Sequence, residues 1–274
     1  MVMDYIACGS AQLWKMDNIL VPHRYDDDYF QLLITSTPYP NQRGFMYHPN
    51  DYLRWWKERL EAWLPKVNQT TGVVVQVIKY RRTGGWFDRR VFEILWLYEM
   101  LGMGIVDVYI WDKKNAPPNG NHERHDRDEY EFVFVGARSA NYTKNAVRKP
   151  YARKTIVKAK PGNKMRQADV FGSMAGGHSD LHPDGALQGN VLRISSSGDQ
   201  GRPRIEGGVF PRELAERLIL TFSNEGDTII DPCCGSGTSL VVAVENDRFA
   251  VGVDDKAVAI ETTHDWLKEI QGIV

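Results

Sequence analysis

The chain has 274 residues, of which 42% are hydrophobic and 25% are charged, as is usual for a folded globular enzyme. Its 34 lysines and arginines and its 35 aspartates and glutamates give a net charge of −1. This balance excludes a uniformly basic histone-like protein and an acidic disordered chain. The length is sufficient for one domain, or for one domain carrying an insert, with a sizeable core.

The cysteines and the N-terminus indicate a reducing compartment. Cys8, Cys233 and Cys234 form no CxxC pair, so we expect neither a disulfide framework nor a structural zinc site. His178 and His182 lack an evident third ligand, and no metal site is predicted. The N-terminus lacks the apolar core of a signal peptide, and no apolar run approaches the roughly 18 residues of a membrane span. We therefore expect a cytoplasmic location and no membrane partner.

Apolar runs alternate with apolar residues at helical spacing. The runs predict strands over residues 5–8, 29–35, 71–80, 106–111, 130–136, 228–231 and 249–253. The helical spacing predicts helices around 53–63 and over 88–101, 211–222, 238–245 and 257–270. This alternation is typical of an α/β fold. The run over 29–35 favours a central strand covered on both faces, and 106–111 and 130–136 could pair in antiparallel orientation.

Basic residues gather in the middle of the chain. Ten lysines and arginines lie between Arg138 and Arg166, with no aspartate or glutamate among them. Residues 172–208 are rich in glycine, serine and histidine and show little periodicity. We interpret residues 139–205 as an insert built mostly of loops, which separates residues 1–138 from residues 206–274.

A glycine-rich turn, DPCCGSGT from Asp231 to Thr238, lies between a predicted strand and a predicted helix. Its glycines allow backbone N–H groups to approach a ligand at the helix N-terminus, although a turn without a ligand has the same pattern. A P-loop is excluded because no Gly-Lys-Ser/Thr follows, and Leu240 stands where GxGxxG needs its third glycine. Asp254 ends the next strand, about 20 residues later, where a carboxylate can bind both hydroxyls of a ribose. The glycine-rich turn and Asp254 together indicate a ligand that contains a nucleoside.

A second polar turn, Ser36-Thr37-Pro38-Tyr39, also follows an apolar strand. A loop fixed by proline can present an aromatic ring and polar acceptors in one geometry. On its own, this segment is more often a turn whose tyrosine packs on the core.

Together these segments resemble a known family. LITSTPYP, followed far downstream by DTIIDPCCGSGTS, is similar to the DNA amino-methyltransferases, which transfer a methyl group from S-adenosylmethionine to an exocyclic amino nitrogen of a base. The catalytic motif precedes the cofactor motif, which is the order of the β class. The stretches DEYEFVFVGAR and GGVFPRELAERLI also resemble family segments. The resemblance implies a mostly parallel, seven-stranded, Rossmann-like α/β sheet with helices on both faces and an inserted target-recognition region.

The resemblance implies a site for S-adenosylmethionine. The glycine turn would line the amino-acid and ribose region of the cofactor, and Asp254 would bind the ribose hydroxyls. Phe210 and Pro211 would lie near the methionine end, and Ser10 stands where many relatives have an aspartate near the adenine. The predicted cofactor residues are Ser10, Phe210, Pro211, Asp231, Pro232, Cys233, Gly235, Gly237, Thr238 and Asp254.

The resemblance also implies a catalytic loop of Ser36, Thr37, Pro38 and Tyr39. Ser36 and the carbonyl of Thr37 would accept hydrogen bonds from the target amino group, and Tyr39 would stack on the base after it is flipped out of the duplex. The acceptors would draw the amino group toward tetrahedral geometry and free its lone pair for in-line attack on the methyl group, so positioning is the main contribution. No covalent intermediate is required, and the cysteines have no predicted catalytic role.

Three positions depart from the family pattern. Thr37 replaces the first proline of the usual pair and removes one fixed φ angle, so either the activity is lower than in relatives or the loop is held in another way. Cys233 replaces a common phenylalanine, and Ser10 stands where many relatives have an aspartate.

Ser36 fits the family motif, which accepts serine, aspartate or asparagine at this position. Serine rather than aspartate resembles the cytosine-N4 subgroup more than the adenine-N6 subgroup, so we expect N4-methylcytosine. The alternatives are adenine-N6 methylation and a catalytically silent DNA-binding module that keeps the fold.

The basic stretch is the candidate surface for double-stranded DNA. A run of lysines and arginines without carboxylates can bind the DNA phosphates, with an affinity that depends strongly on salt. Each of these residues could equally belong to a solvated loop. The predicted DNA-binding residues are Arg148, Lys149, Arg153, Lys154, Lys158, Lys160, Lys164 and Arg166. The sequence identifies neither a recognition site, nor an oligomeric state, nor a cognate restriction nuclease.

Overall fold

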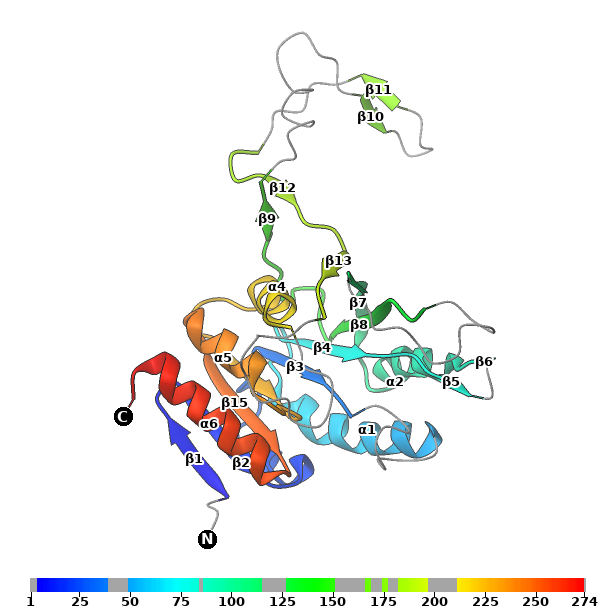
Figure 1. Cartoon of the computed structure of the whole chain (residues 1–274). Coiled ribbons are helices and arrows are strands. Elements are labelled where there is room, and N and C mark those ends of the chain that lie inside the picture. Colours follow the sequence, from blue (N-terminus) through cyan, green and yellow to red (C-terminus); the bar gives the residue numbers. More distant parts are fainter. Residues whose placement is uncertain are drawn as a thin grey trace. The chain divides into compact units, whose positions relative to one another are not determined.

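A computed structural model describes the larger part of the chain (Figure 1). The described residues are 4–38, 49–83, 86–114, 127–150, 166–168, 174–176, 182–196 and 211–273. Contacts between residues divide the chain into unit 1, residues 1–145 and 190–274, and unit 2, residues 146–189. Among the described residues, no helix is both long enough and apolar enough to cross a bilayer.

Unit 1 is built on a nine-stranded sheet in the order β1-β2-β15-β14-β3-β4-β8-β7-β13. The strands from β2 to β4 in this order run parallel, as do β7 and β13, whereas the pairs β1/β2, β4/β8 and β7/β8 are antiparallel. The strands are β1 (Tyr5–Cys8), β2 (Ala11–Lys15), β3 (Leu32–Ser36), β4 (Val73–Ile78), β7 (Gly104–Lys113), β8 (Tyr130–Ala137), β13 (Val191–Ile194), β14 (Thr228–Asp231) and β15 (Phe249–Asp254). The predicted, mostly parallel α/β sheet is confirmed. It has nine strands rather than seven because β1 and β13 extend its two edges.

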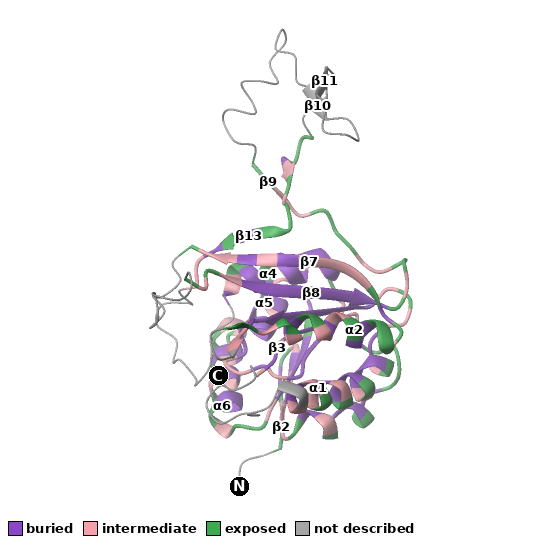
Figure 2. Ribbon diagram, turned by 90° about the vertical axis from the view of Figure 1, so that its right-hand side faces the viewer, coloured by how far each residue is buried: buried purple, intermediate pink, exposed green. Residues whose placement is uncertain are grey.

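Helices cover both faces of the sheet, as predicted. They are α1 (Pro49–Trp63), α2 (Glu93–Met100), α4 (Arg212–Phe222), α5 (Thr238–Glu245) and α6 (Ala257–Gln271). One apolar cluster joins α4, α5 and α6 to the sheet, and a second joins α1 and α2 to it. Side chains alternate along a strand, so β3 places Leu32 and Ile34 in the first cluster and Leu33 in the second. β3 is therefore the central strand that its apolar run predicts, and the middle of the sheet is buried (Figure 2).

Shorter elements connect these layers. They are the 3-10 helices η1 (Asn18–Leu20), η2 (Pro22–Arg24), η3 (Leu64–Lys66) and η4 (Arg89–Phe92), and the strand pair β5 (Arg82–Thr83) and β6 (Trp86–Phe87). The strand β2 has no counterpart among the predicted strands, since AQLWK mixes polar and apolar side chains. It forms because Gly9, at φ +54°, turns the chain back along β1 and because β15 provides a parallel partner.

The predicted loop insert 139–205 is too wide. β13 lies within it, yet this strand pairs in parallel with β7, and its Leu192 and Ile194 are buried. Residues 139–145 and 190–196 therefore belong to unit 1. The alternation of Leu192 and Ile194 in VLRI is too short to predict a strand from sequence. The strand becomes recognisable only from its pairing with β7.

Unit 2 contains two short antiparallel strand pairs among its described residues. β9 (Arg148–Lys149) pairs with β12 (Ala186–Leu187), and β10 (Arg166–Ala168) pairs with β11 (Met174–Gly176). Arg148 Nη1 donates a hydrogen bond of 2.9 Å to the Gly185 carbonyl. Gly185 has φ +101°, and a Cβ there would lie 2.2 Å from the Lys149 carbonyl oxygen, so only glycine fits this close approach.

Leu192→Ala tests whether β13 belongs to the core. Leu192 is 4% exposed, whereas its neighbour Val191 is 55% exposed and provides a matched control. Leu192→Ala should lower the free energy of unfolding by about 2–5 kcal/mol because it leaves a cavity. Val191→Ala should cost less than about 1 kcal/mol. Equilibrium urea unfolding measures both, and equally small losses would contradict the placement of β13.

Candidate active site

The two predicted motifs leave the sheet at one edge. β14 pairs in parallel with β3 on one side and with β15 on the other. Ser36 ends β3, Asp231 ends β14 and Asp254 ends β15. The carboxyl ends of parallel strands share an edge, and ligands of α/β sheets bind there. The structure therefore brings together the glycine turn, Asp254 and the segment that begins at Ser36. We call this segment, the predicted catalytic loop, the Ser36 loop.

Two glycines shape the turn between β14 and α5. Gly235 has φ +52° and Gly237 has φ +79°, both in the left-handed region that glycine favours. Gly237 precedes the first residue of α5, Thr238, which is 3% exposed. The Cys234 N–H donates a hydrogen bond of 3.0 Å to the Val253 carbonyl. The turn is thereby fixed against the end of β15.

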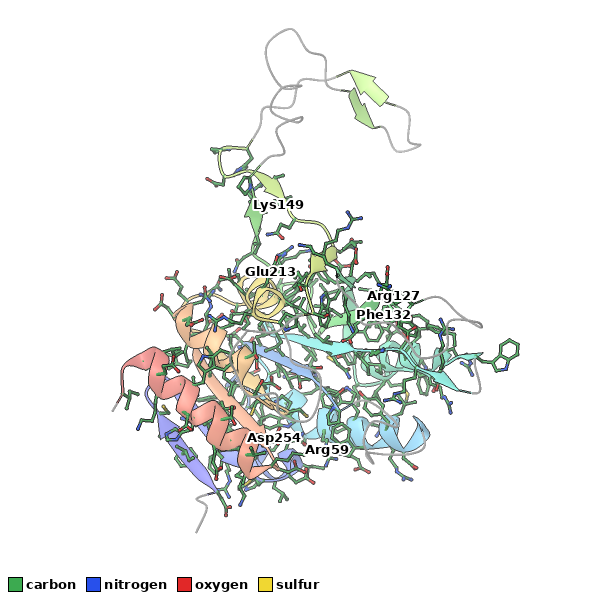
Figure 3. The ribbon with its side chains drawn as sticks, viewed as in Figure 1. Arg59, Arg127, Phe132, Lys149, Glu213 and Asp254 are labelled. Carbon is green, nitrogen blue, oxygen red and sulfur yellow. The ribbon has the colours of Figure 1, made fainter. Side chains whose placement is uncertain are left out.

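Asp254 joins the turn to its own strand end (Figure 3). Its Oδ2 accepts a 3.0 Å hydrogen bond from the Gly235 N–H, and its Oδ1 accepts a 2.9 Å hydrogen bond from the Lys256 N–H. Burial raises the pKa of this carboxyl, while these two backbone hydrogen bonds oppose the rise. Each carboxylate oxygen can accept a further hydrogen bond, so ribose hydroxyls could still bind.

Asp231 is committed to the interior of the turn. It is 5% exposed, its Oδ1 accepts a 3.0 Å hydrogen bond from the Cys233 N–H, and its Oδ2 accepts one from the Ser239 hydroxyl. Burial raises the pKa of Asp231 from 3.8 to about 6, against the opposing effect of these hydrogen bonds. The carboxyl therefore shapes the turn from within.

The structure contradicts the prediction that Ser10 lines the cofactor site. The Ser10 N–H donates 2.9 Å to Gln271 Oε1, and its carbonyl accepts 3.0 Å from the Ala250 N–H. Ala250 lies near the start of β15, whereas Asp254 ends that strand. The chain turns at Gly9, and β2 then runs parallel to β15. Ser10, which directly precedes β2, therefore lies at the edge of the sheet opposite to Asp254.

Asn18, which follows β2, reaches the glycine turn instead. Its Nδ2 donates 2.8 Å to the Pro232 carbonyl and 3.3 Å to Cys233 Sγ. Asn18 is 8% exposed, and its Oδ1 has no hydrogen-bond partner within the described part of the chain. Sequence reasoning missed this residue because it missed β2. Once that strand is known, Asp17-Asn18 is the polar pair beyond its carboxyl end.

Only some of the remaining predicted site residues lie within the part of the chain that the structure describes. Thr37 is 2% exposed and Pro38 is half-buried, and Pro211 is buried directly before α4. Arg148 and Lys149 form β9, and the Arg166 backbone lies in β10. The predicted residues that lie outside the described ranges are Tyr39, Arg153, Lys154, Lys158, Lys160, Lys164 and Phe210.

Gly237→Ala and Gly235→Ala form a matched pair. Both alanines would occupy a left-handed backbone conformation, which costs about 1–2 kcal/mol. A Cβ at Gly237 would also lie 2.3 Å from Thr263 Cγ2, whereas a Cβ at Gly235 has no atom within 4 Å. Gly237→Ala should therefore lower the free energy of unfolding by at least ~1 kcal/mol more than Gly235→Ala. Equal losses in urea unfolding would contradict the packing of Thr263 against this turn.

Asp231→Asn should change the pH dependence of stability. The pKa of Asp231 is raised to about 6 in the folded chain, so the folded chain binds this proton more tightly than the unfolded chain. As pH rises from about 4 to 7, the unfolding free energy of wild type should fall by roughly 2–3 kcal/mol relative to that of Asp231→Asn. Urea unfolding of both proteins across this range measures the difference, and a constant difference would contradict the raised pKa.

The chain is similar to known DNA methylases. Residues 30–265 match the family model N6_N4_Mtase, described as DNA methylase. The orphan methyltransferase M.BamHII of Bacillus amyloliquefaciens is 27% identical over 257 residues, which cover 88% of this chain and 90% of that protein. The type II methyltransferase M1.MboII of Moraxella bovis is 26% identical over 181 residues, covering 62% of this chain and 65% of the relative.

Solved structures show the same fold. The cytosine-N4-specific PvuII DNA methyltransferase matches with a TM-score of 0.74 at 15% identity, over 97% of this chain and 92% of the other. A putative DNA modification methylase from Thermus thermophilus, complexed with S-adenosyl-L-methionine, matches with a TM-score of 0.62 at 20% identity, over 94% of both chains. Because the family model spans both motif loops, the chain belongs to the family of N6/N4 DNA methylases.

Proposed function

We propose that this chain is an S-adenosylmethionine-dependent DNA methyltransferase that modifies the N4 amino group of a cytosine flipped out of the duplex. The observation that carries the proposal is that the Ser36 loop and the glycine turn leave neighbouring parallel strands at one edge. Cytosine is favoured over adenine by Ser36 in place of aspartate. The fold similarity to a cytosine-N4-specific enzyme supports the same choice.

The proposed cofactor site consists of the glycine turn, Asp254 and Asn18. The N-terminus of α5 and its preceding N–H groups suit the carboxylate of a methionine moiety. Asp254 suits the ribose hydroxyls. The buried Oδ1 of Asn18, which has no partner among the described residues, suits an N–H donor of the ligand. When bound, S-adenosylmethionine supplies an electrophilic methyl group. Asp231 would act by keeping the turn in shape.

The proposed catalytic contribution is positioning. Ser36 and the carbonyl of Thr37 would accept hydrogen bonds from the target amino group, which favours the tetrahedral geometry in which its lone pair is free. Tyr39 would stack on the flipped base. Burial raises the pKa of the Cys233 and Cys234 thiols well above their ordinary value. Both therefore stay protonated at neutral pH and are poor nucleophiles, which agrees with transfer without a covalent intermediate.

We assign contact with double-stranded DNA to the basic stretch from Arg138 to Arg166, most of which lies in unit 2. Ten cations without an intervening carboxylate favour phosphate contacts. Among its described members, Arg148 donates to the Gly185 carbonyl and so also supports the fold of unit 2, while Lys149 is exposed (Figure 3).

Two substitutions separate cofactor binding from methyl transfer. Asp254→Ala should raise the Kd for S-adenosylmethionine about 10-fold or more, because hydrogen bonds to a carboxylate are lost. The adjacent, exposed Asp255 gives the control Asp255→Ala, which should bind normally. Ser36→Ala should abolish methylation of DNA and leave this Kd unchanged. Calorimetry and transfer of a labelled methyl group measure the two effects.

Normal cofactor affinity in Asp254→Ala would contradict the assignment of the ribose site. Full methylation by Ser36→Ala would contradict the assignment of the catalytic loop. Cofactor binding by the wild-type chain without any methylation of varied DNA would favour the silent DNA-binding module.

A further inference from the structure

A buried polar network surrounds the side chain of Thr37. Thr37 Oγ1 lies 2.6 Å from the Tyr52 hydroxyl, and either oxygen could be the donor. Gln76 Nε2 donates to Thr37 Oγ1 at 3.1 Å and to the Tyr52 hydroxyl at 2.9 Å. All three side chains are almost completely buried, with 2% exposure or less. The three polar groups therefore satisfy one another out of contact with water.

The orientation of the Gln76 amide is fixed from its other end. Gln76 Oε1 accepts 2.9 Å from Trp56 Nε1 and 3.2 Å from the Tyr98 hydroxyl. An indole N–H can only donate, so the carbonyl end of the amide must face Trp56. The NH₂ end must then face Thr37 and Tyr52, and one of the two hydroxyl hydrogens joins these residues.

The network ties the Ser36 loop to regular elements. Tyr52 and Trp56 lie on α1, Gln76 lies in the middle of β4, and Tyr98 lies on α2. Burial raises the pKa of the Tyr52 hydroxyl far above its ordinary value, so this group keeps its proton for hydrogen bonding. A flip of Gln76 or a shift of Thr37 would leave buried polar groups unpaired, which proteins avoid.

We propose that Tyr52 and Gln76 are positioning residues, which hold the Ser36 loop in its reactive geometry through the hydroxyl of Thr37. The network does by hydrogen bonding what a proline ring at this position does by fixing φ. The Thr37 carbonyl and the Ser36 hydroxyl are thereby held in position to accept hydrogen bonds from the target amino group. This proposal rests on the proposed function, and it explains how the chain tolerates threonine in place of the usual proline.

Removal of the hydroxyls should slow methyl transfer without weakening cofactor binding. Thr37→Val keeps the shape of the side chain and Tyr52→Phe keeps the ring, and each should lower kcat on the order of 10- to 100-fold, because small misplacements of positioning groups are costly. The Kd for S-adenosylmethionine should change by no more than about twofold. Thr37→Ser keeps a hydroxyl and should retain most of kcat.

Tyr25→Phe is the matched control for the loss of a buried tyrosine hydroxyl. Tyr25 is 9% exposed, and its hydroxyl makes hydrogen bonds of 2.8 Å with Trp14 and Gln12. Both partners lie on β2, which is separated from β3 by β15 and β14. Tyr25→Phe should lower stability and leave kcat unchanged.

The double variant Thr37→Val/Tyr52→Phe gives the decisive comparison. In the Thr37→Val background, Tyr52→Phe should change kcat by less than about threefold, because the network no longer holds the loop. A purely structural role of Tyr52 predicts the same loss of kcat in both backgrounds, and that result would overturn the proposal.

Hydrogen exchange provides a readout that does not depend on activity. The amides of Ser36 and Thr37 should exchange faster in Thr37→Val and Tyr52→Phe than in wild type or Tyr25→Phe. Unchanged exchange, or wild-type kcat in Thr37→Val, would overturn the positioning role while the methyltransferase assignment stands. A wild-type chain that methylates no DNA would instead overturn the proposed function and this role with it.

Discussion

The parallel pairing of β14 with β3 is the constraint on which the rest of the structure depends. These strands come from opposite ends of the chain, yet they are neighbours at the centre of the sheet. Their carboxyl ends therefore bring Asp231 and Ser36 to one edge, with Asp254 beside them on β15. Both apolar clusters meet at β3, which has core side chains on both faces. The core and the proposed reaction site are thus fixed by the same two strands.

The two loops at this edge are held by different means. In the glycine turn backbone N–H groups are donors, since Gly235 donates to the Asp254 carboxylate and Cys234 donates to the Val253 carbonyl. The Ser36 loop is held by side chains, through the hydroxyl of Thr37 and the amide of Gln76. A turn that must expose N–H groups to a ligand needs glycine and leaves little room for side chains. A loop that presents hydroxyl and carbonyl acceptors can instead be fixed by side chains of the neighbouring elements, here α1 and β4.

Apolar patterning predicted the central elements because those strands and helices are buried on defined faces. It missed β2 and β13, which are short, lie at or next to an edge, and depend on partners distant in sequence. Because both motifs follow strand ends, the sequence predicted that they lie at the carboxyl edge of the sheet, where the structure has them. The roles of Asn18 and Gln76 could not be predicted from local pattern. Gln76 interrupts a run of valines in β4, and only the packing of α1 and α2 shows what its amide binds.

We propose that this edge of the sheet transfers a methyl group to the N4 of cytosine in DNA. The most direct measurement is nucleoside mass spectrometry of unmethylated DNA of varied sequence, incubated with the purified chain and S-adenosylmethionine. We expect N4-methylcytosine. N6-methyladenine would keep the family and contradict the choice of base drawn from Ser36. The absence of any methylated base, from a chain that binds the cofactor, would contradict methyl transfer to DNA.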